Sequence, residues 1–542
     1  MKFPLEVDDL IKRSEKAYAR KLNWRQIYED CYEYALPQRN LYDGAYEGGV
    51  PGQKKMVKVF DSTAIHSTQR FANRLQSGLF PPYGRWMRLE PGTDIPVDRR
   101  IEAQAALDIY AEKFFTILRQ SNFDLAMGEF LLDLTVGTAA MMVQPGDGDM
   151  PVRFQPVPEY LLAFDEGVHG TPENVYRRMR MKVETIETTW PDAKLSPTLK
   201  RMMVERPTEE VDLLEATTHD TKKDEWHYCL IFGRDKEKIV HRNMRFSPWV
   251  ISRYSKLAGE IYGRGPLVAA LPDIKTLNKT VELLLKNASL AIAGVYTAAD
   301  DGVLNPQTIR IVPGAIIPVA RNGGPQGESL RALPRAGDFN VTQLVLQDIR
   351  MNVKKMLLDD TLPPDTMSAR SATEIAERMK ELATNLGSAF GRLITETMVP
   401  LVTKTLQIMD EVGMIDLPLK INGLEVKVVP ISPIAQAQQM GEIEKTLQWF
   451  QIIQQMGPEG QVAAKPGEIV DMIADNLGIP AKVRTTPEER EEKMQEMQQQ
   501  QQAMMAMQMA QEAAASGALP VDQASEEPAE PPLPGEDFEE ED

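Results

Sequence analysis

Helical periodicity dominates the first 142 residues. Apolar side chains recur at helical spacing over residues 6–36, where Pro37 should end the helix, and again over 61–79. Two more helices are expected within 101–142, with a break near Ser121–Asn122. Between these helix pairs, Tyr83–Leu89 is expected to be a loop that enters a short strand.

Residues 151–255 have a different pattern. Short runs of β-branched and aromatic residues alternate with Pro and Gly, which is typical of strands. The first 260 or so residues therefore predict a mixed α+β unit, with Trp86 and Trp249 in its core rather than at an interface. The expected strands are Val152–Val157, Val175–Val183, Trp226–Phe232 and Trp249–Tyr254.

Two helices of equal length follow, over 273–293 and 338–358, and each should be about 31 Å long. Gly294 should close the first helix, and Asp338 is a suitable N-cap for the second. The inner face of the second helix is expected to carry Val345, Ile349, Val353 and Met356. Residues 295–337 hold six Gly and five Pro and predict a small β insert with strands at Thr308–Val312 and Ala315–Val319.

A loop and a very long helix come next. Residues 359–370 cannot be helical across Pro363–Pro364. Ser371–Glu374 is a capping box, and the helix that it opens should reach about Val412. Pro400 predicts a kink near Glu396–Val399, and Gly387 and Gly391 permit a second bend.

The C-terminal part predicts a strand within 419–431 and helices over 433–478. Residues 487–515 are rich in Glu, Gln, Met and Ala and should be helical, either as a solvated or packed helix or as part of an inward-facing barrel. Residues 516–542 are acidic and rich in Pro, which is typical of a disordered tail.

Net charge and cysteine content limit the kinds of ligand and the cellular compartment that fit this chain. The 542 residues carry a net charge of −18, which argues against tight electrostatic binding of nucleic acid. Ten of the acids lie from Val521 onward, where there is no Lys or Arg, so most of the excess belongs to the tail. Two cysteines fit a reducing compartment. No signal peptide or membrane-spanning stretch is evident, so we expect a soluble chain.

Catalytic motifs are missing from the sequence. His219, His227, Cys229 and His241 lie close together, but their spacing matches no zinc pattern, and ordinary strand residues are the favoured interpretation. Gly263–Pro266 lacks the third glycine of a dinucleotide loop, and its proline is better suited to the first turn of a helix. We therefore expect no catalytic residue, metal or cofactor.

The order of these elements resembles the portal proteins of tailed bacteriophages, and most of all the head-to-tail connectors of short-tailed, podovirus-type phages. Three segments carry the resemblance, which covers about residues 10–480: Tyr83–Leu89, Tyr262–Pro266, and Ser371–Ile375 with the helix through Pro400–Val402. It implies a mainly α fold with a mixed α+β wing, a two-helix stem, a small β-containing clip, a long kinked helix and a helical crown.

The resemblance also implies boundaries for these parts. The wing would comprise 1–262 and 371–432, the stem helices 263–294 and 338–358, the clip 295–337, the tunnel loop 359–370 and the crown 433–485. Residues 486–515 would be the Gln/Met-rich helix or barrel, and 516–542 the tail.

The implied function is a ring, usually of twelve subunits, at one capsid vertex of the virion. Such a ring is assembled in the host cytoplasm, conducts double-stranded DNA without reading its sequence, and docks terminase and later the tail adaptor. Capsid, scaffolding and ejection proteins are further implied partners, and no membrane is involved. The alternative is a helical scaffold or other virion assembly protein that does not translocate DNA.

Three groups of residues are candidates for contacts. A conduit must touch DNA phosphates weakly, and Asp359, Asp360 and Asp365 around a single Arg370 suit such a loop. The implied tunnel-loop residues are Pro363, Pro364, Asp365, Thr366, Met367, Ser368, Ala369 and Arg370. The stem candidates, which form either cationic rings or solvated ion pairs, are Lys275, Lys279, Lys286, Lys354 and Lys355. The clip candidates for partner or inter-subunit contact, rather than plain surface, are Arg310, Arg321, Arg331 and Arg335.

Overall fold

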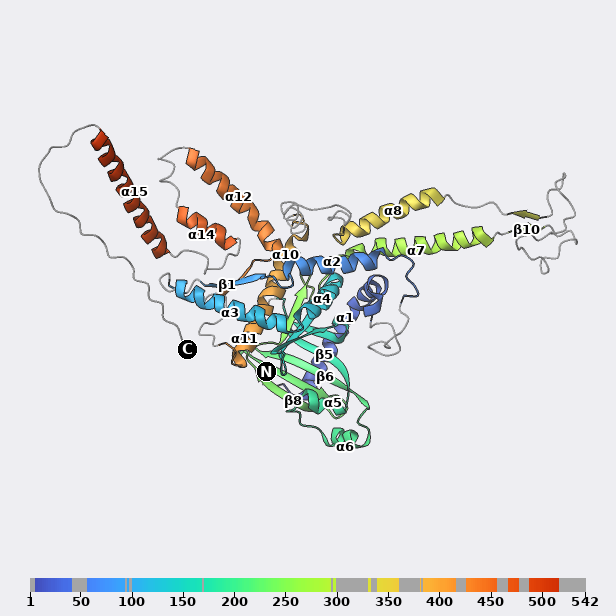
Figure 1. Cartoon of the computed structure of the whole chain (residues 1–542). Coiled ribbons are helices and arrows are strands. Elements are labelled where there is room, and N and C mark those ends of the chain that lie inside the picture. The colour runs from blue at the N-terminus through green and yellow to red at the C-terminus, as the bar shows by residue number, and fades with distance from the viewer. Residues whose placement is uncertain are drawn as a thin grey trace, which may run out of the picture. The chain divides into compact units, whose positions relative to one another are not determined.

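The computed structural model describes residues 5–40, 56–92, 95–96, 100–167, 170–293, 296–298, 330–332, 339–359, 381, 384–415, 426–455, 466–476 and 487–515. Figure 1 shows the helices and strands of the chain. Contacts divide the chain into two units. One comprises Met1–Lys465 with Ile469–Gly478, and the other Pro466–Glu468 with Ile479–Asp542. The mixture of helices and sheets that the sequence predicts is confirmed.

The N-terminal helices lie where periodicity places them. They are α1 (Val7–Ala35), α2 (Thr63–Leu79), α3 (Arg100–Gln120) and α4 (Phe123–Val136), with the short turn η1 (Pro37–Arg39) after α1 and strand β1 (Met87–Pro91) before α3. The expected extension of the fourth helix to residue 142 is wrong. Gly137, at φ +159°, ends the helix, and residues 138–142 join a sheet.

Two antiparallel sheets follow α4. The first has the order β3–β2–β9, and the second runs β4–β5–β6–β7–β8 in sequence order. The three-stranded sheet consists of β2 (Thr138–Pro145), β3 (Val152–Val157) and β9 (Trp249–Arg253). The five-stranded sheet consists of β4 (Leu162–Glu166), β5 (Pro172–Lys182), β6 (Glu210–Asp220), β7 (Glu225–Phe232) and β8 (Glu237–Met244). The short helices η3 (Glu159–Leu161), α5 (Glu184–Thr189) and α6 (Pro197–Glu205) connect strands.

The Gly263–Pro266 segment packs against the C-terminal end of α4. A Cβ on Gly265 would lie 2.0 Å from the Thr135 carbonyl oxygen, and one on Gly263 would lie 2.3 Å from the Gly137 oxygen. Close backbone approach therefore accounts for both glycines. As the sequence indicates, Pro266 opens the next helix, α7 (Pro266–Ala293).

The C-terminal half of the chain completes the N-terminal core. Strand β12 (Val426–Pro430) pairs antiparallel with β1, and buried side chains of residues 386–415 share one cluster with Trp86. The expected long helix is divided into α10 (Ser388–Leu393), the π-helix η4 (Ile394–Met398) and α11 (Val399–Glu411). Gly387, at φ +50°, breaks the helix before α10, and η4 lies at the predicted kink. The capping box Ser371–Glu374 lies outside the described residues.

The described residues after β12 include the helices α12 (Pro433–Gln455), α14 (Pro466–Asn476) and α15 (Pro487–Ala515). The methionines of α15 described in the structure are exposed, which leaves both interpretations of this helix open: Met494, Met497, Met504, Met505, Met507 and Met509. Trp86 and Trp249 are buried, as predicted. Within the described ranges, none of the helices combines the length and apolar character needed to cross a membrane.

The side chain of Lys404 in α11 is partly buried, and we expect it to make the stability of the protein depend on pH. Its Nζ donates to the carbonyl oxygens of Ser247 at 2.5 Å and Trp249 at 2.7 Å, and burial lowers its pKa to about 7. The unfolded chain binds this proton up to about pH 10, so between pH 7 and 10 folding releases it and stability rises with pH. Between pH 7 and 10, the free energy of unfolding should therefore rise by up to about 1.4 kcal/mol per pH unit because of Lys404. Lys404→Met should remove this rise, as measured by urea titrations at several pH values.

Lys427→Met, at an exposed position of β12, is the matched control for this measurement. Parallel stability curves for Lys404→Met and the unsubstituted protein over pH 7–10 would contradict the prediction.

Candidate functional site

The helices α7 and α8 (Phe339–Met356) run beside each other (Figure 1) and are the two helices that we expect to form a stem. Leu277, Val281 and Leu346 are buried between them, with Leu284 and Ile349 partly buried alongside. The segment that joins the two helices has one described β pair, β10 (Tyr296–Ala298) with β11 (Leu330–Ala332). The expected strands at Thr308–Val312 and Ala315–Val319 and the N-cap Asp338 lie outside the described residues.

The inner face of α8 differs from the expected one. Leu346 and Val353 are buried and Ile349 is partly buried, whereas Val345 and Met356 are exposed. Both stem helices therefore present large apolar side chains to solvent in the single chain: Leu283, Leu285, Leu344, Val345, Met351 and Met356.

One stripe of α7 carries alternating charge. Lys275, Lys279, Glu282 and Lys286 follow each other at helical spacings of four, three and four residues. Glu282 accepts hydrogen bonds from Lys286 at 2.6 Å and Lys279 at 2.9 Å, and these bonds lower its pKa. Two of the three candidate lysines on this helix thus share one partly buried carboxylate.

The remaining stem lysines are of two kinds. Lys275 donates to Asp30 of α1 at 2.5 Å, so it joins the stem to the first helix of the chain. Lys354 and Lys355 of α8 are exposed, and no acidic partner for either is found within the described part of the chain. These two are the candidates whose charge is most available to a ligand.

A short segment before α2 forms hydrogen bonds with one stem helix and an ion pair with the other. Asn278 of α7 accepts from the Phe60 amide at 2.7 Å and donates to the Lys58 carbonyl at 2.7 Å. Arg350 of α8 pairs with Asp61 at 2.7 Å. Burial would raise the pKa of Asp61, but hydrogen bonds from Thr63 and Arg350 lower it. The carboxylate thus stays charged, and the root of the stem is held by polar contacts.

Asp359, the first residue of the segment expected to be a tunnel loop, faces the protein interior. It is 6% exposed, accepts from Ser67 of α2 at 2.8 Å, and lies 3.4 Å from both Arg70 and Arg74. Arg74 also donates to the Leu358 carbonyl. Our interpretation of Asp359 as part of an acidic loop surface is therefore wrong, because two guanidinium groups from α2 neutralise it.

The other predicted contact residues are mostly outside the described ranges. This applies to the whole run Pro363–Arg370, to Asp360, and to Arg310, Arg321 and Arg335. Arg331 lies in β11, opposite Thr297 of β10. The anchor at Asp359 was missed by sequence reasoning, because its partners lie almost 300 residues earlier and no local pattern links them.

The histidines of the five-stranded sheet have ordinary partners. His219 contacts Glu173 at 2.8 Å and Asp224 at 3.0 Å, and His227 contacts Asn243 at 2.9 Å. Cys229 is buried. Within the ranges that the structure covers, no group of three His, Cys, Asp or Glu side chains could hold a metal ion.

Comparison with known proteins gives consistent matches. The profile of a family described as "Bacteriophage head to tail connecting protein" matches residues 7–484. The chain is 24% identical over 505 residues to a "Probable portal protein" of Bordetella phage BPP-1, covering 87% of each chain. It is 23% identical over 464 residues to a "Portal protein" of Salmonella phage epsilon15, covering 81% of each.

Solved structures also match. A chain from "Virion of native gene transfer agent (GTA) particle" has 13% identity and a TM-score of 0.34, with 80% of this chain and 95% of that chain covered. A chain from "Neck of empty GTA particle computed with C6 symmetry" has 14% identity and a TM-score of 0.35, with the same coverage.

Proposed function

Because this chain belongs to the bacteriophage head to tail connecting protein family, we propose that copies of it form the ring at the portal vertex of a virion, with the twelve subunits typical of the family. The ring conducts double-stranded DNA during packaging and ejection and docks terminase and then tail proteins. We assign it no catalytic step.

The observation that carries this proposal is the apolar surface of the stem. Six large apolar side chains of α7 and α8 are exposed although the seam between the helices is already filled. Several large apolar side chains exposed on one helix pair are typical of a protein interface. In a closed ring, neighbouring copies of the same helix pair bury these side chains on each side.

The charged stripe of α7 suits a conduit. Lys279 and Lys286 are exposed yet share Glu282, so their attraction for phosphate is partly neutralised. Strong contacts would hold DNA in place, because each neutralised phosphate adds to the electrostatic free energy of binding. We assign this stripe of α7 to the DNA-facing side of the stem.

The remaining parts are assigned by family resemblance. Residues 1–262 and 371–432 form the wing, 295–337 the clip and 433–485 the crown. The four clip arginines face terminase and the tail adaptor, and Pro363–Arg370 form the tunnel loop. Asp359, held by Ser67, Arg70 and Arg74, supports this assignment because it fixes one end of the loop to α2.

Deletion of Pro363–Met367 tests the DNA-conducting role. The deletion begins four residues after the Asp359 anchor, so rings of normal size should still form, as seen by light scattering and negative-stain imaging. Packaging or retention of DNA should fall at least tenfold in particles. A control that replaces these five residues by a Gly/Ser segment of equal length keeps the chain span. Normal amounts of packaged DNA in the deletion variant would contradict the role of the loop.

A further inference from the structure

The C-terminal end of α8 is held in a strained conformation. Leu358, two residues after the helix, has φ +52°, which lies in the left-handed region that a leucine adopts only at a steric cost. Its amide donates to the Lys355 carbonyl at 3.0 Å, and the Asp359 amide donates to the Lys354 carbonyl at 2.8 Å. These two bonds form a Schellman motif, whose left-handed position is usually a glycine.

The residue after Leu358 is also unusual for such a motif. A Schellman motif is frequently accompanied by an apolar contact between the residue at this position and the last turn of the helix. Here the position carries Asp359, which is buried and accepts a hydrogen bond from Ser67 of α2 at 2.8 Å. Burial of a carboxylate without partners is costly, so this end of α8 depends on the groups of α2 that bind it.

Arg74 of α2 contacts both unusual residues. Its guanidinium group donates to the carbonyl oxygen of Leu358 and, at 3.3 Å, to that of Asp359, and it lies 3.4 Å from the Asp359 carboxylate. Arg70, one turn earlier on α2, lies at the same distance from this carboxylate. Its side chain is 63% exposed, against 15% for Arg74, and the contacts that the structure describes for it include neither carbonyl oxygen. Arg74 is therefore the residue that holds the backbone of the motif.

Leu358 differs from the other left-handed residues of the described ranges because it is partly buried. Besides glycines, Tyr83, Asp224 and Lys236 have positive φ values, and all three are exposed at turns. The Leu358 side chain packs against one hydrophobic cluster of the core, whereas Leu357 is buried in another. The left-handed backbone thus directs two successive leucines into different parts of the core, and this packing offsets part of the strain.

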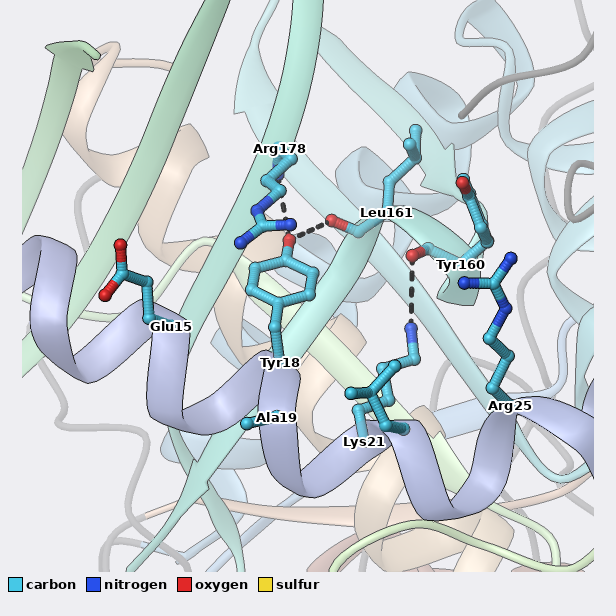
Figure 2. A pocket seen from close by; sticks show the side chains of 9 residues that line it. Glu15, Tyr18, Ala19, Lys21, Arg25, Tyr160, Leu161 and Arg178 are labelled. Carbon is cyan, nitrogen blue, oxygen red and sulfur yellow. Dashed lines mark hydrogen bonds between the residues drawn. The ribbon is translucent and has the colours of Figure 1, made fainter. Parts of the chain in front are cut away.

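Lys21 of α1 makes the same kind of contact to a turn that is not strained. Its Nζ donates to the carbonyl oxygens of Glu159 at 2.5 Å, Tyr160 at 3.2 Å and Leu162 at 2.7 Å, beside a cavity of about 310 Å³ (Figure 2). None of residues 159–162 has a positive φ. A cation thus closes a relaxed turn at η3 and a strained one at the end of α8, so only the contact of Arg74 opposes stored strain.

We propose that the end of α8 is a latch with two states. In the closed state, Arg74 and Asp359 hold Leu358 in the left-handed conformation. In the open state this contact is broken, and Leu358 joins α8 as an ordinary helical residue. Backbone strain favours opening and the contacts of Arg74 oppose it, so a shift of α2 relative to α8 changes the residue at which α8 ends. The latch lies within one chain and does not depend on the proposed ring.

Hydrogen exchange of the Asp359 amide in the full chain, corrected for intrinsic rates, measures the opening of the latch. This amide is the readout because a helical Leu358 donates to the Lys354 carbonyl in its place. Arg74→Gln should speed the exchange about tenfold, because it removes a buried charged donor. Arg70→Gln is the matched control: it removes an exposed charge at the same distance from the same carboxylate and should change the exchange less than about twofold.

Leu358→Gly and Leu358→Ala distinguish strain from packing. Both remove the packing of the leucine side chain, but only glycine adopts the left-handed conformation without a steric cost. The Asp359 amide should therefore exchange about five- to tenfold more slowly in Leu358→Gly than in Leu358→Ala. Adding Leu358→Gly to Arg74→Gln should bring the exchange back towards the rate of the unsubstituted protein.

Equal exchange of the Asp359 amide in Leu358→Gly and Leu358→Ala would overturn the proposal, because no strain would then be stored at residue 358. Equal effects of Arg74→Gln and Arg70→Gln would do the same, because the bonds from Arg74 to the two carbonyl oxygens would then add nothing. If Arg74→Gln fails to fold, the comparison of the glycine and alanine variants still decides, because both keep Arg74 and Asp359 in place.

Discussion

Replacing Leu344 and Met351 together by glutamate should prevent ring assembly and leave a folded subunit. The two side chains are seven residues apart on α8 and are 63% and 55% exposed, so the chain does not need them for its own core. In the proposed ring each is buried by a neighbour, and each contributes about 1.5–3 kcal/mol per interface. Two buried carboxylates would add a desolvation cost of several kcal/mol.

Light scattering coupled to size exclusion measures the result, with circular dichroism as the check on folding. The main species should change from a ring to a monomer. Val204→Glu is the matched control: Val204 of α6 is 84% exposed and lies outside the stem, so rings should form normally. If the stem variant still assembles at the same protein concentration, the apolar face of α8 is not the subunit interface.

This same face shows how far the sequence could predict the site. Periodicity located both stem helices, because a helix with an apolar seam repeats every three to four residues. It misplaced the seam of α8, since Val345 and Met356 are as apolar as Leu346 and Val353. When a helix is apolar on two faces, periodicity alone does not predict which face is buried. The packing of the partner helix decides it.

Strand prediction failed for a related reason. Thr138–Val143 is buried throughout and continues an apolar helix, so nothing except Gly137 indicated the change from helix to strand. Strand β6, in contrast, carries Glu, Asp, Thr and His and does not look like a core strand, although it is central in its sheet. Both errors arise because pairing with neighbouring strands in the sheet outweighs local propensity.

Long-range polar pairs were the least predictable feature of the fold. Arg253 of β9 and Glu396 of the π-helix η4 are 143 residues apart and join at 2.7 Å, with Arg253 almost fully buried. Glu396 also accepts from the Arg253 backbone amide at 3.0 Å. An ion pair therefore joins the kink that Pro400 indicated to the three-stranded sheet. No sequence pattern predicted this pair.

Arg253→Met should accordingly destabilise the fold by about 3–5 kcal/mol, the usual cost of leaving one member of a buried ion pair alone. Arg253 also donates to the carbonyl oxygens of Gly170 at 3.0 Å and Ile261 at 3.2 Å, which would lose this donor. Urea titration followed by tryptophan fluorescence measures the loss. Arg392→Met removes only the partly exposed helical pair to the same carboxylate, at 2.9 Å, and should cost less than about 1 kcal/mol.

The double variant Arg253→Met with Glu396→Leu distinguishes the stability that depends on the ion pair from the stability that depends on the contacts around it. Removing both charges eliminates the unpaired carboxylate, so the double variant should recover part of the stability that the single variant loses. Equal losses for Arg253→Met and Arg392→Met would show that burial of Arg253 adds nothing to the pair. A double variant less stable than the single one would mean that Glu396 holds η4 through other contacts, and the π-helical turn would then not depend on the bond to β9.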